Sequence, residues 1–85
     1  MLAVTEAARV YLKDALMQSH APEDTAVRIV TKGDGLATKI DTLHQGDSIV
    51  EDDGRLLLLM DSGLSQRLSE RTLDIQPDAH KLLLI

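Results

Sequence analysis

The feature that most constrains the fold is a change in the spacing of apolar residues near Pro22. Before this proline, four apolar residues recur with the 3.6-residue period of an amphipathic helix: Ala8, Leu12, Ala15 and Leu16. Thr5 can cap such a helix, because its hydroxyl can accept a hydrogen bond from a free backbone N–H of the first turn. Pro22 disfavours helical geometry at the residue before it. The pattern therefore predicts a helix over residues 5–19.

After Pro22 the chain becomes a series of short β-type runs separated by turn signals. The expected strands are residues 26–31, 36–43, 48–51, 55–60, 72–76 and 81–85. Asp53-Gly54 predicts a hairpin, because glycine tolerates a positive φ at no steric cost. Asp61 and Ser62 can cap a short helix around residues 64–69. The order predicts one α+β domain over residues 1–85, in which a helix precedes a mostly antiparallel or mixed β meander with a short inserted helix.

Charge and aromatic content argue against nucleic-acid and membrane partners. The formal net charge is −5, with 9 Lys and Arg against 14 Asp and Glu, and no basic run occurs. Phosphate binding needs clustered cations, and base stacking needs aromatic side chains, of which Tyr11 is the only one. The longest apolar run, residues 56–60, is far shorter than the roughly 20 residues of a membrane span. We expect this run to be a strand buried on both faces.

The chain contains no cysteine, which removes disulfides, thiolate metal sites and cysteine nucleophiles together. Small secreted domains usually carry disulfides, and the first residues lack the basic and apolar regions of a signal peptide, so we expect a cytoplasmic protein.

A domain of 85 residues buries roughly 60% of its unfolded surface. An extra interface would stabilise so small a domain, which makes a homodimer plausible.

The sequence offers few candidates for a phosphate or metal site. Residues 33–38 (GDGLAT) resemble a glycine-rich phosphate loop, but Thr38 stands where a third glycine belongs and a strand rather than a helix follows. We therefore interpret the glycine-rich part, residues 32–35, as a plain β-turn. The acidic residues Glu51, Asp52 and Asp53, with Asp47 nearby, could bind a hard cation. They lack the EF-hand spacing, and a solvated hairpin tip is the preferred interpretation.

Catalytic motifs are absent from the sequence. His20, His44 and His80 lie far apart and in no metal-binding spacing, although two of them could meet in space. Residues 63–67 (GLSQR) lack the closing glycine of a nucleophile elbow. We expect no catalytic residue, no enzyme activity and no bound cofactor.

Five short segments, taken in order, carry a resemblance to a known family. They are residues 4–8 (VTEAA), 26–29 (AVRI), 46–54 (GDSIVEDDG), 59–68 (LMDSGLSQRL) and 72–75 (TLDI). They resemble the T-E-A-A helix start, the G-L-R-I strand, the central hairpin, the V-D-x-x-S-x-x-x-L stretch and the T-L-D-Y strand of the A-type iron–sulfur carriers, also called HesB-like or iron–sulfur biosynthesis domains. The resemblance implies a HesB-like pseudo-barrel or sandwich.

The same resemblance implies that this chain has lost the family's cluster ligands. The family's first ligand cysteine lies in a G-G-C-S-G loop, and Leu36 occupies that position here. Two further cysteines belong to a C-G-C-G tail, and the chain ends at Ile85 before that tail would begin. Clusters are held mainly by thiolates, and leucine offers iron no lone pair.

Two functions follow as hypotheses. The first is a non-catalytic interaction or scaffold module with the carrier fold, an unknown protein partner and a possible homodimer interface. The alternative is iron binding in cluster assembly through carboxylates and imidazoles, which requires Asp34 or residues 51–53 to converge with His44 or His80.

Overall fold

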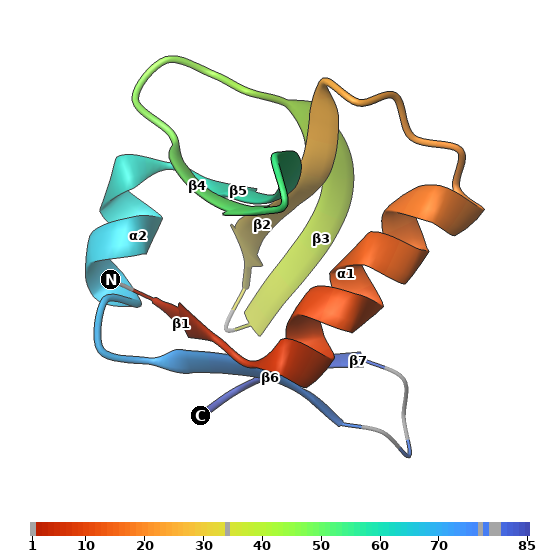
Figure 1. Ribbon diagram of the computed structural model, residues 1–85. Helices are drawn as coiled ribbons and strands as arrows, with labels where there is room; N and C mark the ends of the chain where they lie inside the picture. The colour runs from red at the N-terminus through yellow and green to blue at the C-terminus, as the bar shows by residue number, and fades with distance from the viewer. Residues whose placement is uncertain (1, 34, 77, 79–80) are drawn as a thin grey trace.

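The computed structural model describes residues 2–33, 35–76, 78 and 81–85, and it confirms the predicted α+β plan (Figure 1). The elements follow in this order: β1 (Ala3–Val4), α1 (Glu6–Gln18), β2 (Thr25–Lys32), β3 (Gly35–Thr42), β4 (Ser48–Asp52), β5 (Arg55–Met60), α2 (Ser62–Arg67), β6 (Thr72–Gln76) and β7 (Lys81–Leu84). No helix formed by the described residues is long and apolar enough to span a membrane.

Helix α1 begins where the sequence predicts, and its cap also joins it to a distant strand. The Thr5 hydroxyl oxygen accepts a hydrogen bond from the Ala8 N–H at 3.2 Å, which satisfies one free donor of the first turn. The same hydroxyl donates to the Asp74 carboxylate on β6 at 2.8 Å. The apolar face of the helix is buried, with Leu12 and Leu16 almost completely inaccessible to solvent.

The larger sheet has the strand order β3-β2-β5-β4, so β3 and β4 form its two edges although they are consecutive in the chain. Strands β2 and β3 pair antiparallel without interruption, from Thr25 opposite Thr42 to Lys32 opposite Gly35. Strands β2 and β5 pair in parallel. Strand β5 is buried from residue 57 to residue 60, as its uninterrupted apolar run predicts. The expected hairpin at Asp53-Gly54 is present, with positive φ at both residues.

The smaller sheet has the order β1-β6-β7, with β1 parallel and β7 antiparallel to β6. One core lies among the two sheets and the helices, and it is almost entirely aliphatic. It consists of Leu2, Leu12, Leu16, Val27, Ile29, Leu57, Leu58, Met60, Leu64, Leu68 and Leu73. Each sheet contains one parallel pair, β1–β6 or β2–β5, which joins segments that are distant in sequence.

Candidate functional site

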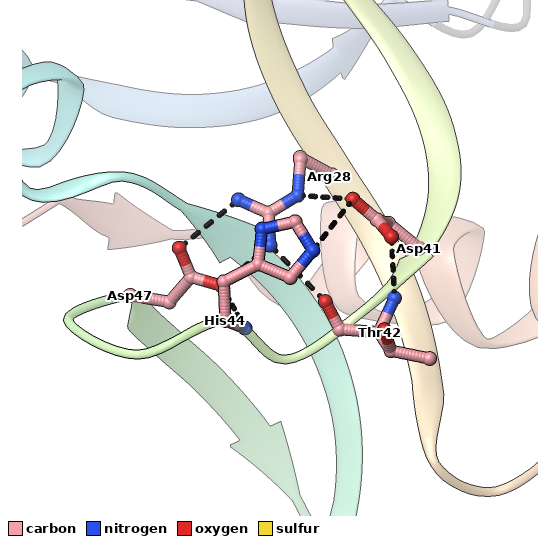
Figure 2. Close-up of polar contacts among 5 residues, drawn as sticks. All are labelled: Arg28, Asp41, Thr42, His44 and Asp47. Atoms are coloured by element: carbon pink, nitrogen blue, oxygen red, sulfur yellow. Dashed lines mark hydrogen bonds and ion pairs between the residues drawn. The ribbon is translucent and has the colours of Figure 1, made fainter.

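Arg28, in the middle of β2, is the centre of a buried polar cluster that includes the C-terminal end of β3 and the loop after it (Figure 2). Its Nε donates to the Asp41 carboxylate at 2.7 Å, and its Nη1 donates to the Asp47 carboxylate at 3.0 Å. Its Nη2 donates to the carbonyl of Thr42 at 3.2 Å and to the second Asp47 oxygen. The planar guanidinium, with five donors in a fixed fork, suits this bidentate arrangement.

The carboxylates of the cluster also order the loop between β3 and β4. Asp47 accepts from the His44 backbone N–H at 2.7 Å, and Asp41 accepts from the Thr42 N–H at 2.8 Å. Hydrogen bonds from Arg28 hold the pKa of Asp47 below its ordinary value, and the backbone N–H of Thr42 does the same for the pKa of Asp41. Bonding to Asp47 raises the pKa of Arg28. Both carboxylates are therefore ionised at neutral pH.

This cluster has a structural role rather than a ligand-binding one. Only 3% of the Asp47 side chain and 7% of the Arg28 side chain is exposed, and their donors and acceptors are directed at one another. No buried side-chain nitrogen or oxygen among the described residues lacks a hydrogen-bond partner. The buried donors and acceptors of the cluster already have partners within it and are not available to a ligand. The cluster therefore holds the β3–β4 loop against strand β2.

The acidic residues near the β4–β5 hairpin do not converge on a cation site. Lys13 of α1 forms an ion pair with Asp52, which lowers the pKa of that carboxyl. The Asp53 side chain is 91% exposed, and Glu51 is exposed as well. Asp47 belongs to the Arg28 cluster. Residues 51–53 form the hairpin tip that the sequence predicts, with Glu51 and Asp53 exposed, whereas Asp47 lies in the β3–β4 loop.

The histidines do not form a metal site within the part of the chain that the structure describes. His20 is exposed just beyond α1, and His44 lies with its Nε2 at 3.5 Å from Asp41. Asp34 and His80, which the iron-binding alternative names as optional ligands beside residues 51–53 and His44, lie outside the described residues. Among the residues that are described, no three His, Cys, Asp or Glu side chains are placed to hold a metal ion.

The other two motif interpretations concern turns and caps. Gly33, with φ +57°, lies between β2 and β3, and a strand rather than a helix follows it, as the β-turn interpretation predicts. Asp61 caps α2 by accepting from the Leu64 N–H at 2.8 Å, and Ser62 is the first residue of that helix.

A groove of about 930 Å³ is a concave feature that the sequence alone does not reveal. Residues of α1, β2, β3, β6 and β7 line it, and the buried side chains of Leu12, Val27 and Ile29 contribute to it. Leu36 and Ile40 on β3 also line it and are 41% and 43% exposed. An exposed apolar patch within a groove of this size is typical of a binding site.

The groove has a one-sided charge. Lys39, Arg71 and Lys81 line it, and no carboxylate is found among the described residues that do so. This is notable in a chain with a net charge of −5. The local potential of the groove is therefore opposite in sign to the net charge of the molecule.

Comparison with known proteins shows that this fold occurs in other solved structures. No protein-family model and no curated protein sequence matches the chain. Solved structures do match: Escherichia coli SufA, which is involved in the biosynthesis of iron–sulfur clusters, aligns over 99% of this chain and 81% of its own, with a TM-score of 0.66 and 18% identity. The chain has the SufA fold. A protein from Aquifex aeolicus aligns over 87% of this chain and 77% of its own, with a TM-score of 0.62 and 25% identity.

The match confirms the resemblance to HesB-like proteins at the level of the fold. Leu36 is the residue that the resemblance puts at a cluster-ligand position. In this SufA-like domain, Leu36 lies on the wall of the apolar groove. The whole sequence contains no cysteine, so the groove offers no thiolate to a cluster.

Proposed function

We propose that this protein is a non-catalytic interaction module that uses the SufA fold to bind a protein partner in the groove beside β3. The observation that carries the proposal is the exposure of Leu36 and Ile40 in a groove of about 930 Å³ with a cationic lining. Leucine at the position where the resemblance implies a ligand cysteine supports binding of an apolar side chain rather than of iron. We propose a cytoplasmic location, because small secreted domains usually carry disulfides.

Site-specific photo-crosslinking tests the proposal directly. A photoreactive amino acid is placed at Leu36, and a matched control carries it at Glu51, which is also exposed but lies on the opposite edge strand of the same sheet. We expect the Leu36 variant alone to give a discrete adduct in cells, with the partner identified from its crosslinked peptide by mass spectrometry. Equal adducts from both positions, or none from Leu36, would refute a protein-binding groove.

Iron analysis distinguishes the proposal from the iron-binding alternative. The protein is purified anaerobically from an iron-rich culture, and its iron content and visible spectrum are measured. A colourless, iron-free protein is the expected result. Stoichiometric iron or a cluster-like spectrum would overturn the proposal and would direct attention to ligation by His and carboxylate side chains.

A further inference from the structure

We propose that the partner segment is an acidic, extended peptide that adds as a fifth strand to the free edge of β3 and places its apolar side chains in the groove. This inference rests on the proposed function and narrows it to one class of partner. Strand addition supplies main-chain hydrogen bonds for affinity, and pockets for alternate side chains supply specificity.

Strand β3 is the longest edge strand in the two sheets that the described residues form. Strand β1 has two residues and β7 has four, so both are short. Strand β4 is interrupted by a bulge between Val50 and Glu51 and ends in acidic residues. Strand β3 has eight residues, pairs with β2 in unbroken register and contains no proline. Short edges, bulges and charges are the devices that block edge pairing. Strand β3 has the charged residues Lys39 and Asp41, but it is long and regular, and Asp41 is already paired with Arg28.

The side chains of β3 are arranged so that one face of an added strand would meet the groove. Leu36, Thr38 and Ile40 alternate along β3 and therefore share one face. The register puts Thr38 opposite Ile29 and Ile40 opposite Val27, two core residues that also line the groove. A strand added beside β3 would direct every second side chain toward this apolar surface, where Leu36 and Ile40 are exposed.

The charge of the groove selects an acidic partner. Lys39 and Lys81 form no ion pair with any described residue, and Arg71 donates its Nε to the Ile85 carbonyl at 3.1 Å. Lys39 stands between Thr38 and Ile40 and therefore belongs to the other face of β3. In an added strand, carboxylates that alternate with the apolar side chains would lie on that face and would compensate Lys39. A second copy of the chain would instead bring its own three cations to the same place, and like charges across an interface are strongly unfavourable. Charge complementarity therefore favours an acidic peptide over self-association through this edge.

The dimensions suit a segment of about six to eight residues. A strand rises about 3.3 Å per residue, so a peptide matching the eight residues of β3 would extend over roughly 26 Å. The groove volume of about 930 Å³ lies near the upper end of the range for ligand sites, roughly 300–1,000 Å³.

The test uses an acetylated eight-residue peptide in which valine or isoleucine alternates with glutamate, titrated into the intact protein and followed by calorimetry. Two matched peptides serve as controls: one with lysine in place of each glutamate, and one N-methylated at alternate backbone nitrogens so that it cannot form a strand. We expect the acidic peptide to bind at micromolar concentration and both controls to bind at least about tenfold more weakly.

Two protein variants locate the site. Lys39→Glu/Lys81→Glu reverses two exposed groove charges, and Arg67→Glu reverses an exposed charge on α2 outside the groove. We expect the double variant to weaken binding about tenfold or more and Arg67→Glu to leave it nearly unchanged. Circular dichroism checks that both remain folded. Amide hydrogen exchange should show new protection on β3 when the acidic peptide is bound.

Several results would overturn the inference. If the lysine peptide binds as tightly as the acidic peptide, the groove does not select for negative charge. If the N-methylated peptide binds as tightly as the acidic peptide, the peptide does not bind by strand addition. Binding of laurate but not of the acidic peptide, with loss in Lys39→Glu/Lys81→Glu, would assign the groove to an anionic amphiphile. If the acidic peptide fails but Leu36 still crosslinks to one protein, the interaction module stands and only the partner class is wrong.

Discussion

Replacing Arg28 by methionine should destabilise the protein by about 3 kcal/mol. The variant leaves the Asp47 carboxylate buried with the His44 backbone N–H as a hydrogen-bond donor, because both of its ionic hydrogen bonds come from Arg28. Removing one member of a buried ion pair costs roughly 3–5 kcal/mol. We expect the lower end, because 22% of the neighbouring Asp41 side chain is exposed and water can reach the cluster.

Such a loss is large for this chain. At 0.05–0.15 kcal/mol per residue, a domain of 85 residues has a total stability of roughly 4–13 kcal/mol. Each kcal/mol shifts Tm by about 4–8 °C in a domain of this size, so the variant should melt roughly 12–24 °C below the unmodified protein. Adding Asp47→Asn to Arg28→Met removes the buried charge and keeps an acceptor for His44, so it should restore about half of the loss.

The effect of pH on the two proteins should have opposite signs. In the unmodified protein the pKa of Asp47 is lowered, so its stabilising contribution is complete above the unfolded value of about 3.9 and is lost as pH falls through the folded value. In Arg28→Met the carboxylate stays buried without its cation, so its pKa should rise above the unfolded value. The deficit of Arg28→Met should therefore shrink as pH falls from 7 toward 5.

Urea unfolding followed by circular dichroism at pH 7 and pH 5 measures both effects. The reasoning is refuted if Arg28→Met loses less than about 1 kcal/mol at pH 7, a value typical of exposed ion pairs. It is also refuted if the deficit is the same at both pH values, or if Asp47→Asn recovers nothing in the Arg28→Met background.

Three further substitutions test the fold by the same unfolding assay. Leu58→Ala removes a fully buried side chain and should cost about 2–5 kcal/mol; a loss below 1 kcal/mol would contradict the assigned core. Thr5→Ala removes the α1 cap and should cost about 1 kcal/mol, and an NMR titration should show the pKa of Asp74 rising toward its ordinary value. Gly46→Ala should cost about 1–2 kcal/mol from backbone strain alone, because φ is +87° and no atom lies within 4 Å of an added Cβ; no loss would contradict that conformation.

Local signals predicted the elements of this fold well, because their causes lie within a few residues. The Thr5 cap and the spacing of Leu12 and Leu16 define α1, and Asp53-Gly54 defines the β4–β5 hairpin. The parallel pairing of β1 with β6 and of β2 with β5 was beyond such reasoning. These pairs depend on burial of apolar faces that are separated by tens of residues, and no short pattern specifies them.

The candidate site was harder to predict than the fold, for two different reasons. Arg28 alternates with Val27 and Ile29, which suggests an exposed face, yet it is buried because Asp41 and Asp47 neutralise it. The available signal for a buried ion-pair cluster was a strand with one arginine followed by two aspartates. Many exposed charges show the same pattern, so this signal is not specific. The groove has no sequence signature, because its walls come from five separate elements.

The expected homodimer remains a prediction. The cations that line the groove argue against a dimer interface at that surface. If a second copy bound at β3, the acidic peptide and the dimer would compete, and peptide affinity would fall as protein concentration rises. A dimer formed through β3 would bring the groove cations of both copies together, namely Lys39, Arg71 and Lys81 of each. We therefore expect any dimer to use another surface. Sedimentation equilibrium between 10 and 200 µM protein, with and without peptide, should show the same association state under both conditions. Dissociation of a dimer by the peptide would make the β3 edge the dimer interface and would contradict the charge argument, whatever the peptide affinity.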